Sequence, residues 1–359
     1  MTTLLDPTPQ PLAEPGRRPD RGRAALRTAG RWSAAIGGAL AIFSAMLLLR
    51  GADPLEVLAD MWVSTFLRPR SLAEILNVMA PITLAALAVL VPARAGLTNV
   101  GGEGQVILGA IAAGGTALAL DQQLPGPVVL VLALVAGAVA GAAWAGIAGA
   151  LRLRFQVDEA VSTLLLNFIA LDLLLFLIYQ PWRESAAGQP TTRELADGAK
   201  LPVISGTIVN VGIVIALAAV VVVILVLGRT RWGFRLSVVG GNVEAARRAG
   251  MNVALLVLSA LLVGGLLAGL AGAIQFTGTE YKLRSGFGVQ IGYLGFLASW
   301  LARHRPLPVL LASFVLAALA IAGDSLQLDA QLPAASVNIL TALILAAVLG
   351  WTTVKARRS

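Results

Sequence analysis

Polar side chains that could bind a solute stand inside two otherwise apolar stretches of the sequence. Asn99, Glu103 and Gln105 lie in a glycine-rich segment, and Asn167 and Asp172 lie in the run LLLNFIALDLLLF. Amides and carboxylates of this kind can hydrogen-bond a polar molecule. The Glu103 carboxylate is costly in apolar surroundings unless it is paired or wetted, so we expect it to face the interior of a helix bundle or a cavity. Asn167 could line a solute path, and Asp172 could equally stabilise the bundle.

The sequence contains no constellation of residues for bond-making chemistry. There is no cysteine, and the only histidine is His304, so neither a thiolate nucleophile nor a zinc or iron site of convergent Cys and His ligands can be built. None of the three lysines follows a glycine, as the lysine of a P-loop must (Lys200, Lys282 and Lys355). The sequence therefore predicts no enzyme, no cofactor and no metal, and any dependence on ATP must come from another polypeptide.

The elements that position the polar residues are expected to be membrane-spanning helices. The chain has 359 residues, of which 57% are hydrophobic and 13% charged, with a mean hydropathy of +0.83. A soluble domain has roughly 25% charged residues. Apolar runs of about 18 residues or more recur along the chain, as spanning helices require. The predicted fold class is all-α, a polytopic membrane helix bundle.

Ten spans are predicted, between two tails. A disordered cytoplasmic tail is expected over 1–31, a transmembrane domain over 32–351 and a cytoplasmic tail over 352–359. The interval 53–67 carries three acidic residues and is interpreted as interfacial. The short, glycine-rich run 287–302 is interpreted as re-entrant or broken. The expected spans are 32–49, 72–92, 99–120, 127–150, 160–179, 207–228, 253–275, 287–302, 306–324 and 334–351.

Basic residues fall mainly on one side of these spans. With the first tail in the cytoplasm, 19 lysines and arginines lie inside and 8 lie outside. This asymmetry predicts that both termini and the loop between spans 207–228 and 253–275 are cytoplasmic. Because the basic residues sit in short loops, without a basic face interleaved with aromatics, nucleic acid is excluded as a partner and the lipid bilayer is expected.

Two glycine-rich segments enter the predicted bundle in opposite senses. GLTNVGGEGQVILGA (96–110) enters from inside and RSGFGVQIGYLGFLA (284–298) from outside, each as the second span of a four-span set. This arrangement favours an inverted repeat, whose paired broken segments point toward a midplane solute site. The predicted solute path is lined by Asn99, Glu103, Gln105, Asn167, Phe287 and Trp300.

Other interpretations of these residues stay open. Glu103 could instead be a cap for the amides of Gly101, Gly102 and Gly104. Phe287, Tyr293 and Trp300 could stack on a flat solute or could be interfacial anchors. Two stripes of small residues are interpreted as helix-packing surfaces: Gly137, Gly141, Gly146 and Gly149, and Gly264, Gly265, Gly269 and Gly272.

The loop between spans 207–228 and 253–275 contains GGNVEAARRAG (240–250), a short polar stretch between two apolar runs. Its EAAxxxG pattern resembles the loop by which membrane subunits of ABC importers dock on their ATPase. That resemblance implies a docking role for Glu244, Ala245, Ala246, Arg247 and Gly250. A positive-inside loop with an amphipathic turn is the alternative.

Five segments together resemble the ABC-importer permeases for simple sugars and nucleosides, the branch that includes branched-chain amino acid permeases. They are 96–110, 157–173, 239–253, 265–275 and 284–298, and Asn99 to Gln105 resembles most closely the nucleoside group associated with basic membrane proteins. The resemblance implies a bacterial inner-membrane permease working with an ATP-binding subunit, a second related permease and an extracytoplasmic solute-binding protein. Two departures are Asp158, where the nucleoside group has His, and the absence of an I-x-L-P ending after Gly250.

The function predicted on this basis is inward movement of a nucleoside or related simple sugar. A branched-chain amino acid permease stays open as the substrate alternative. An ion-coupled secondary transporter, in which Glu103 and Asp172 carry protons or bind a cation, is the mechanistic alternative. A membrane scaffold is disfavoured.

Overall fold

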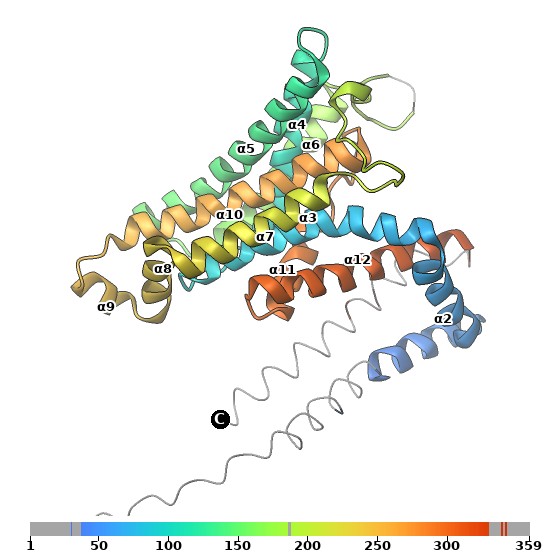
Figure 1. Ribbon diagram of the computed structural model, residues 1–359, viewed down its shortest axis with the longest axis horizontal. Coiled ribbons are helices and arrows are strands. Elements are labelled where there is room, and N and C mark those ends of the chain that lie inside the picture. The colour runs from blue at the N-terminus through green and yellow to red at the C-terminus, as the bar shows by residue number, and fades with distance from the viewer. Residues whose placement is uncertain (1–29, 31–36, 186–187, 330–338, 340–341, 343–359) are drawn as a thin grey trace, which may run out of the picture.

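In the computed structural model, the described residues are 30, 37–185, 188–329, 339 and 342 (Figure 1). Within these ranges the chain forms helices and two isolated β-bridges, which confirms the all-α class. Seven described helices are long and apolar enough to cross a membrane. They are α3 (Pro69–Ala93), α4 (Gly102–Leu120), α5 (Gly126–Phe155), α6 (Glu159–Tyr179), α7 (Gly212–Arg229), α10 (Val253–Gln275) and α12 (Pro306–Asp329).

The count of spans in the described residues is lower than the ten expected. A helix over Gly37–Leu49 and the helix formed by α2 (Pro54–Trp62) with η1 (Val63–Leu67) are bent by 119°, and together they would make an eighth span. The bend occurs where Asp53 accepts a hydrogen bond from Leu55 N (2.8 Å) and Pro54 starts a new helix. The run 287–302 contains only the short α11 (Ile291–Leu301). The expected span 334–351, apart from residues 339 and 342, and both tails, apart from residue 30, lie outside the described residues.

Close packing of α4, α5 and α10 forms the centre of the bundle, and small residues permit it. A Cβ at Gly141 would collide with the carbonyl oxygen of Gly265, and one at Gly269 with that of Gly137. A Cβ at Gly272 would collide with the carbonyl oxygen of Val106 on α4. Both predicted glycine stripes are therefore confirmed as packing surfaces, as expected where apolar burial alone does not drive helix association.

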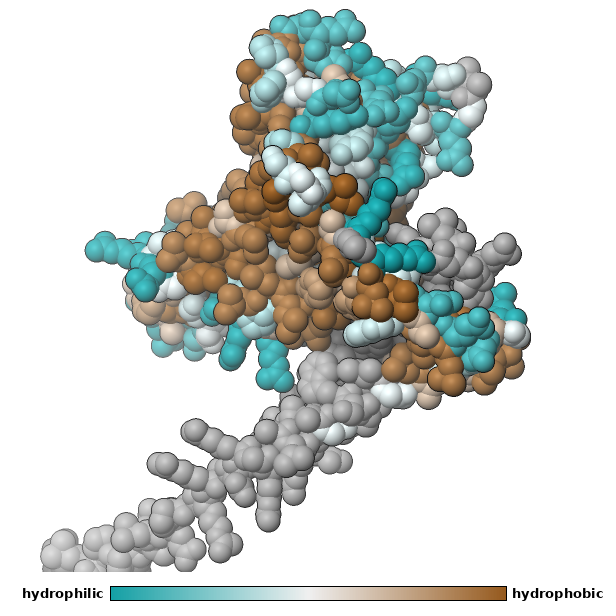
Figure 2. Space-filling view, turned by 45° about the vertical axis from the view of Figure 1, so that its right-hand side comes forward, coloured by the Kyte–Doolittle hydropathy of each residue, from teal (hydrophilic) through white to brown (hydrophobic). Residues whose placement is uncertain are grey.

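The flank and the ends of the bundle differ in polarity. Figure 2 shows apolar residues over much of the visible flank and polar residues toward the extremities. At one end, α8 (Arg231–Gly241) and α9 (Val243–Arg248) connect α7 to α10 (Figure 1). We call this end, with the α3–α4 and α5–α6 turns, the α9 end.

The opposite end carries the connection 180–211, which includes η2 (Asp197–Ala199) and is tied to the chain after α10. Thr192 N donates to Leu283 O (3.0 Å), Leu195 N to Tyr281 O (2.9 Å) and Leu201 N to Thr277 O in η3 (Phe276–Glu280) at 2.8 Å. Hydrogen bonds to Asp197 and Glu194 raise the pKa of Lys200 to about 12. Residues 192–201 of the connection are thus held against the chain after α10.

Replacing Gly269 by valine tests the α5–α10 packing. Gly269→Val should destabilise the purified protein by about 1–3 kcal/mol, because its side chain meets backbone that cannot move aside. Gly228→Val in α7 is the matched control, since no atom lies within 4 Å of a Cβ there. Thermal melting in detergent, read by size-exclusion chromatography, measures both variants. Equal melting of the two would contradict the packing account.

Candidate functional site: two unwound segments and the α9 end

The first glycine-rich segment turns back into the bundle before α4 begins. Asn99 Nδ2 donates to Ala88 O (3.3 Å), five residues before the end of α3, and to Gln105 Oε1 (3.0 Å). Asn99 Oδ1 accepts from Gly101 N (3.1 Å) and from Gln105 Nε2 (3.0 Å). Both side chains are buried. The helix therefore starts at Gly102, three residues later than expected, because Asn99 holds the chain in a turn.

Three polar side chains of α6 satisfy the backbone of this turn. Thr98 N donates to Glu159 Oε1 (3.0 Å) and Val100 N to Thr163 Oγ1 (3.2 Å). Asn167 accepts from Gly104 N (2.7 Å) and donates to Val100 O (3.0 Å). Residues 159, 163 and 167 are spaced by four and so share one helix face. We call these three side chains the α6 ladder.

Sequence reasoning identified Asn167 and missed Glu159 and Thr163. Their regular spacing of four at the start of an apolar run was the signal that could have found them. Glu159 also pairs with Arg152 across the α5–α6 turn. Asp158, noted as a departure from the nucleoside group, caps α6 by accepting hydrogen bonds from Ala160 N (2.8 Å) and Val161 N (3.1 Å).

The second glycine-rich segment is unwound over 284–290 and lies along α4. Leu283 lies beside Gly114, and Gly288 beside Val106 and Ile107, so the segment descends toward the start of α4. Gly286, Gly288 and Gln290 have positive φ angles of 89°, 68° and 81°. These conformations end at Ile291, where α11 begins next to Gly102.

Glu103 joins the two segments. Its Oε1 accepts from Gln290 N (2.6 Å), and its Oε2 accepts from Gly292 N (2.8 Å) and Tyr293 N (3.3 Å). These amides are the free donors at the start of α11, where a negative charge is favoured. Gly292 lies so close to Glu103 N that a Cβ would collide with it. We call this contact the junction.

The cap interpretation of Glu103 was right in kind but wrong in its partners. The amides of Gly101 and Gly104 are taken by Asn99 and Asn167, which leaves the carboxylate free to cap α11. Glu103 is 5% exposed. Asn99, Glu103, Gln105 and Asn167 are therefore brought together, and every one of them is hydrogen-bonded within the protein. Their predicted contact with solute stays a prediction.

The two predicted aromatic residues do not meet. Phe287 is fully buried with its ring edge against Phe276, 6.5 Å between centroids. Trp300, 44% exposed, lies near the other end of α11 against Phe296 (5.9 Å) and His304 (5.2 Å). Burial and the charge of Arg94 lower the pKa of His304. A single stacking site formed by Phe287 and Trp300 is not present in this conformation.

At the α9 end, the EAA-like sequence forms a short helix. Asn242 caps it by accepting from Ala245 N (2.9 Å), and Gly250 ends the following turn with a φ of +74° that favours glycine. Ala246 is fully buried, whereas the side chains of Glu244 and Arg247 are 61% and 65% exposed. The helix is thus fixed to the bundle on one side and offers charged groups on the other.

A polar groove of about 750 Å³ lies beside this helix. Its walls come from the α3–α4 turn, the α5–α6 turn and the chain around α9, and they include Arg152, Asp158 and Arg247. A groove with charged walls at the end of a helix bundle can accept a protruding element of another protein.

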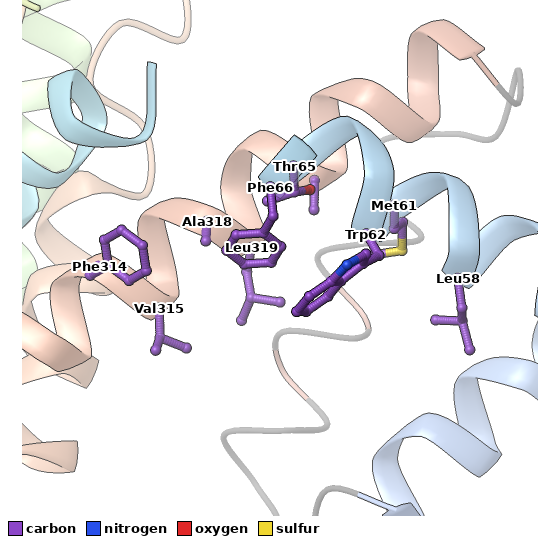
Figure 3. A pocket seen from close by; sticks show the side chains of 10 residues that line it. Leu58, Met61, Trp62, Thr65, Phe66, Phe314, Val315, Ala318 and Leu319 are labelled. Atoms are coloured by element: carbon purple, nitrogen blue, oxygen red, sulfur yellow. The ribbon is translucent and has the colours of Figure 1, made fainter. Parts of the chain in front are cut away.

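A second groove, of about 250 Å³, lies between α2 with η1 and α12 (Figure 3). Its labelled lining includes Met61, Trp62, Phe66 and Phe314 and is almost entirely apolar. Convergent polar groups are needed to orient a hydroxyl-rich solute, so this groove does not suit one.

Spanning helices around two unwound, glycine-rich segments are typical of solute transporters. Comparison with known proteins identifies the family within this class. Residues 71–349 match the family described as "Branched-chain amino acid transport system / permease component", and the chain belongs to this family. It is a permease.

Several relatives are ABC transporter permeases. The chain is 36% identical to the glucose ABC transporter permease protein TsgB13 of Haloferax volcanii, over 86% of this chain and 83% of the relative. It is 30% identical to the guanosine ABC transporter permease protein NupP of Bacillus subtilis (85% and 88%). It is 27% identical to the nucleoside ABC transporter permease protein NupB of Lactococcus lactis (84% and 85%). The resemblance to sugar and nucleoside permeases is confirmed.

Replacing Glu103 by glutamine tests the junction. Glu103→Gln removes one of two accepting oxygens and points an amide N–H₂ group at donors of α11, so it should cost about 1–3 kcal/mol of stability. Glu74→Gln is the control, because Glu74 pairs with Arg70 at the surface (2.9 Å), a pair worth about 0–1 kcal/mol. Thermal melting in detergent compares them, and a Glu103→Gln protein as stable as the control would disprove the capping role.

Proposed function

We propose that this protein is the permease subunit of an ABC importer that moves a nucleoside or a related simple sugar inward, driven by a separate ATPase subunit docked at α9. The observation that carries the proposal is α9 itself: a rigidly capped helix with exposed charges, bearing the EAAxxxG pattern, in a chain without a P-loop. Membership of the permease family supports it.

The packing of the α9 end provides a route from the ATPase to the junction. Ala246 of α9 belongs to the same buried apolar cluster as Ala95 and Leu97 of the α3–α4 turn. A Cβ at Gly240 of α8 would collide with the carbonyl oxygen of Arg94 in that turn. The turn leads directly into the first glycine-rich segment. A shift of α9 would therefore move the backbone that the α6 ladder and Glu103 hold, which is rigid-body gating.

The same proposal covers orientation, partners and roles. The α9 end and both termini face the cytoplasm of a bacterial plasma membrane, with the transmembrane domain over 32–351. The 180–211 end faces an extracytoplasmic solute-binding protein, and a second, related permease completes the complex. Glu244, Ala245, Ala246, Arg247 and Gly250 form the ATPase contact. Asn99, Glu103, Gln105 and Asn167 shape the path, with Phe287 and Trp300 at its edges.

The substrate proposal follows the relatives, whose names give glucose, guanosine and nucleosides as their substrates. These molecules share hydroxyl groups and carry no net charge. In the structure, Glu103 is committed to three backbone amides, which disfavours a proton-carrying role for it.

A charge reversal on α9 tests the docking role. Glu244→Arg should reduce co-purification of the ATPase and solute uptake by about tenfold or more, because it reverses the charge that α9 offers to a partner and replaces the pairing of Glu244 with Arg247 and Arg248 by repulsion. Glu56→Arg, exposed on α2, is the matched control and should leave both unchanged. Normal co-purification and uptake with Glu244→Arg would rule out α9 as the contact.

Competition for uptake tests the substrate class. Uptake of labelled guanosine by cells expressing the complete transporter should fall with excess nucleoside or simple sugar and persist with excess leucine. It should also stop when the ATPase cannot hydrolyse ATP. Inhibition by leucine would favour the amino acid alternative, and uptake that follows a proton or sodium gradient without ATP would favour a secondary transporter.

A further inference from the structure

One face of α6 has no partner among the residues that the structure describes. The helix contacts chiefly α4 and α5 at the side of the bundle (Figure 1). Its buried face includes the α6 ladder together with Ala170 and Leu174. The opposite face is exposed and mostly apolar, with Leu165 57%, Phe168 59%, Ile169 54% and Phe176 58% exposed. This spacing of three and four residues makes one continuous stripe along the helix.

Asp172 stands in the middle of this stripe and is itself exposed. It lies thirteen residues after Glu159 and seven before Tyr179, so at ~1.5 Å per residue it is about 20 Å from one helix end and about 10 Å from the other. An aspartate side chain is too short to reach water from there. Across the described part of the chain, no hydrogen bond or ion pair reaches its carboxylate.

The exposed faces of two other described helices do not share this feature. Val131 and Val139 of α5 are 58% and 59% exposed, and α5 has no charged residue before Arg152. Val221 of α7 is 55% exposed, and α7 has no charged residue before Arg229. Those faces suit lipid tails. A carboxylate facing hydrocarbon is costly, so ionisable residues at membrane depth lie against protein or a wetted cavity and find a partner there.

We infer that the exposed face of α6 is the contact with the second permease subunit, and that this subunit presents a cationic or amide side chain to Asp172. The inference rests on the proposed function, which requires two permeases in one complex. The apolar residues around Asp172 pack against the second subunit. The charge fixes how the two subunits align, because the carboxylate is hydrogen-bonded only when the donor lies opposite it.

The charge also disfavours direct α6-against-α6 packing of two copies of this chain. Two copies related by a twofold axis along the membrane normal place identical residues at the same depth, so packing α6 against α6 brings Asp172 toward Asp172. Like charges in apolar surroundings repel strongly. A related but distinct permease with a donor at this depth removes the conflict.

Site-specific photocross-linking tests the contact. A photoactivatable benzoylphenylalanine replaces Phe168 in one preparation and Phe176 in another, in membranes of cells expressing the complete transporter with distinct tags on each subunit. Both should cross-link to the second permease. The same residue at Val131 or Val139 of α5 is the matched control and should cross-link to lipid only. Because the aromatic side chain is retained at 168 and 176, the fold should be preserved, which size-exclusion chromatography checks.

The outcomes separate this inference from the function on which it rests. If Phe168 and Phe176 positions cross-link only to lipid, or to a second copy of this chain, while the ATPase still co-purifies, the inference is overturned and the proposed function stands. If no ATPase co-purifies with the unsubstituted chain, the proposed function fails.

Charge variants give an independent readout. Asp172→Lys should lower co-purification of the second permease by about tenfold or more, because it sets a cation against a donor. Asp172→Asn, which keeps an acceptor, should lose much less. Binding of the ATPase at α9 should be retained in both. Equal recovery of the second permease with Asp172→Lys and with unsubstituted protein would overturn the inference.

Discussion

Backbone that leaves a helix inside a membrane must find its hydrogen bonds within the protein, because lipid offers none. This constraint organises the centre of the molecule. The turn before α4 and the segment before α11 both expose amides at the same place. Glu159, Thr163 and Asn167 take the amides of the first, and Glu103 takes those of the second. Glycines at 102 and 292 let the two backbones approach closely enough for one carboxylate to reach across.

These polar residues hold the two unwound segments together. With their hydrogen bonds already made, they resist collapse of the unwound segments. A solute would meet groups that are already oriented. A movement of the α3–α4 turn would also displace the junction. The apolar cluster that contains Ala95, Leu97 and Ala246 links this turn to α9. The protein therefore has one continuous connection between the end that we assign to the ATPase and the unwound centre.

Much of the fold could be predicted because it depends on local composition. Apolar runs predicted the long helices, and the stripes of glycines predicted the packing surfaces of α5 and α10. The cap at Asn242 and the turn at Gly250 follow from residue types at the ends of a short helix. The start of α7 at Gly212, five residues later than expected, reflects Asn210, whose Oδ1 accepts from Gly212 N (2.9 Å). Such local competition between side chain and backbone is difficult to assign from one sequence.

The candidate site was predicted only in part, because its key contacts join distant segments. Glu103 and Gly292 are 189 residues apart in the chain. Nothing in the sequence near Glu103 indicates which amides donate hydrogen bonds to its carboxylate. Because its distant partner could not be recognised, the amides of its own glycine-rich segment were the ones that Glu103 was expected to cap. Whether Trp300 could stack on a solute depends on its place along α11, and the hydropathy pattern does not predict where this helix ends. Asp172 was noticed as a polar residue, but only the structure shows that it faces outward.

The side of the membrane on which α9 lies tests the central claim most directly. The chain has no cysteine, so Arg247→Cys and Asp197→Cys give single thiols at opposite ends of the bundle, both on well exposed side chains. A membrane-impermeant maleimide should label position 197 in intact cells and position 247 only after the cells are opened. Labelling of position 247 from outside intact cells would place α9 away from any ATPase and contradict the account.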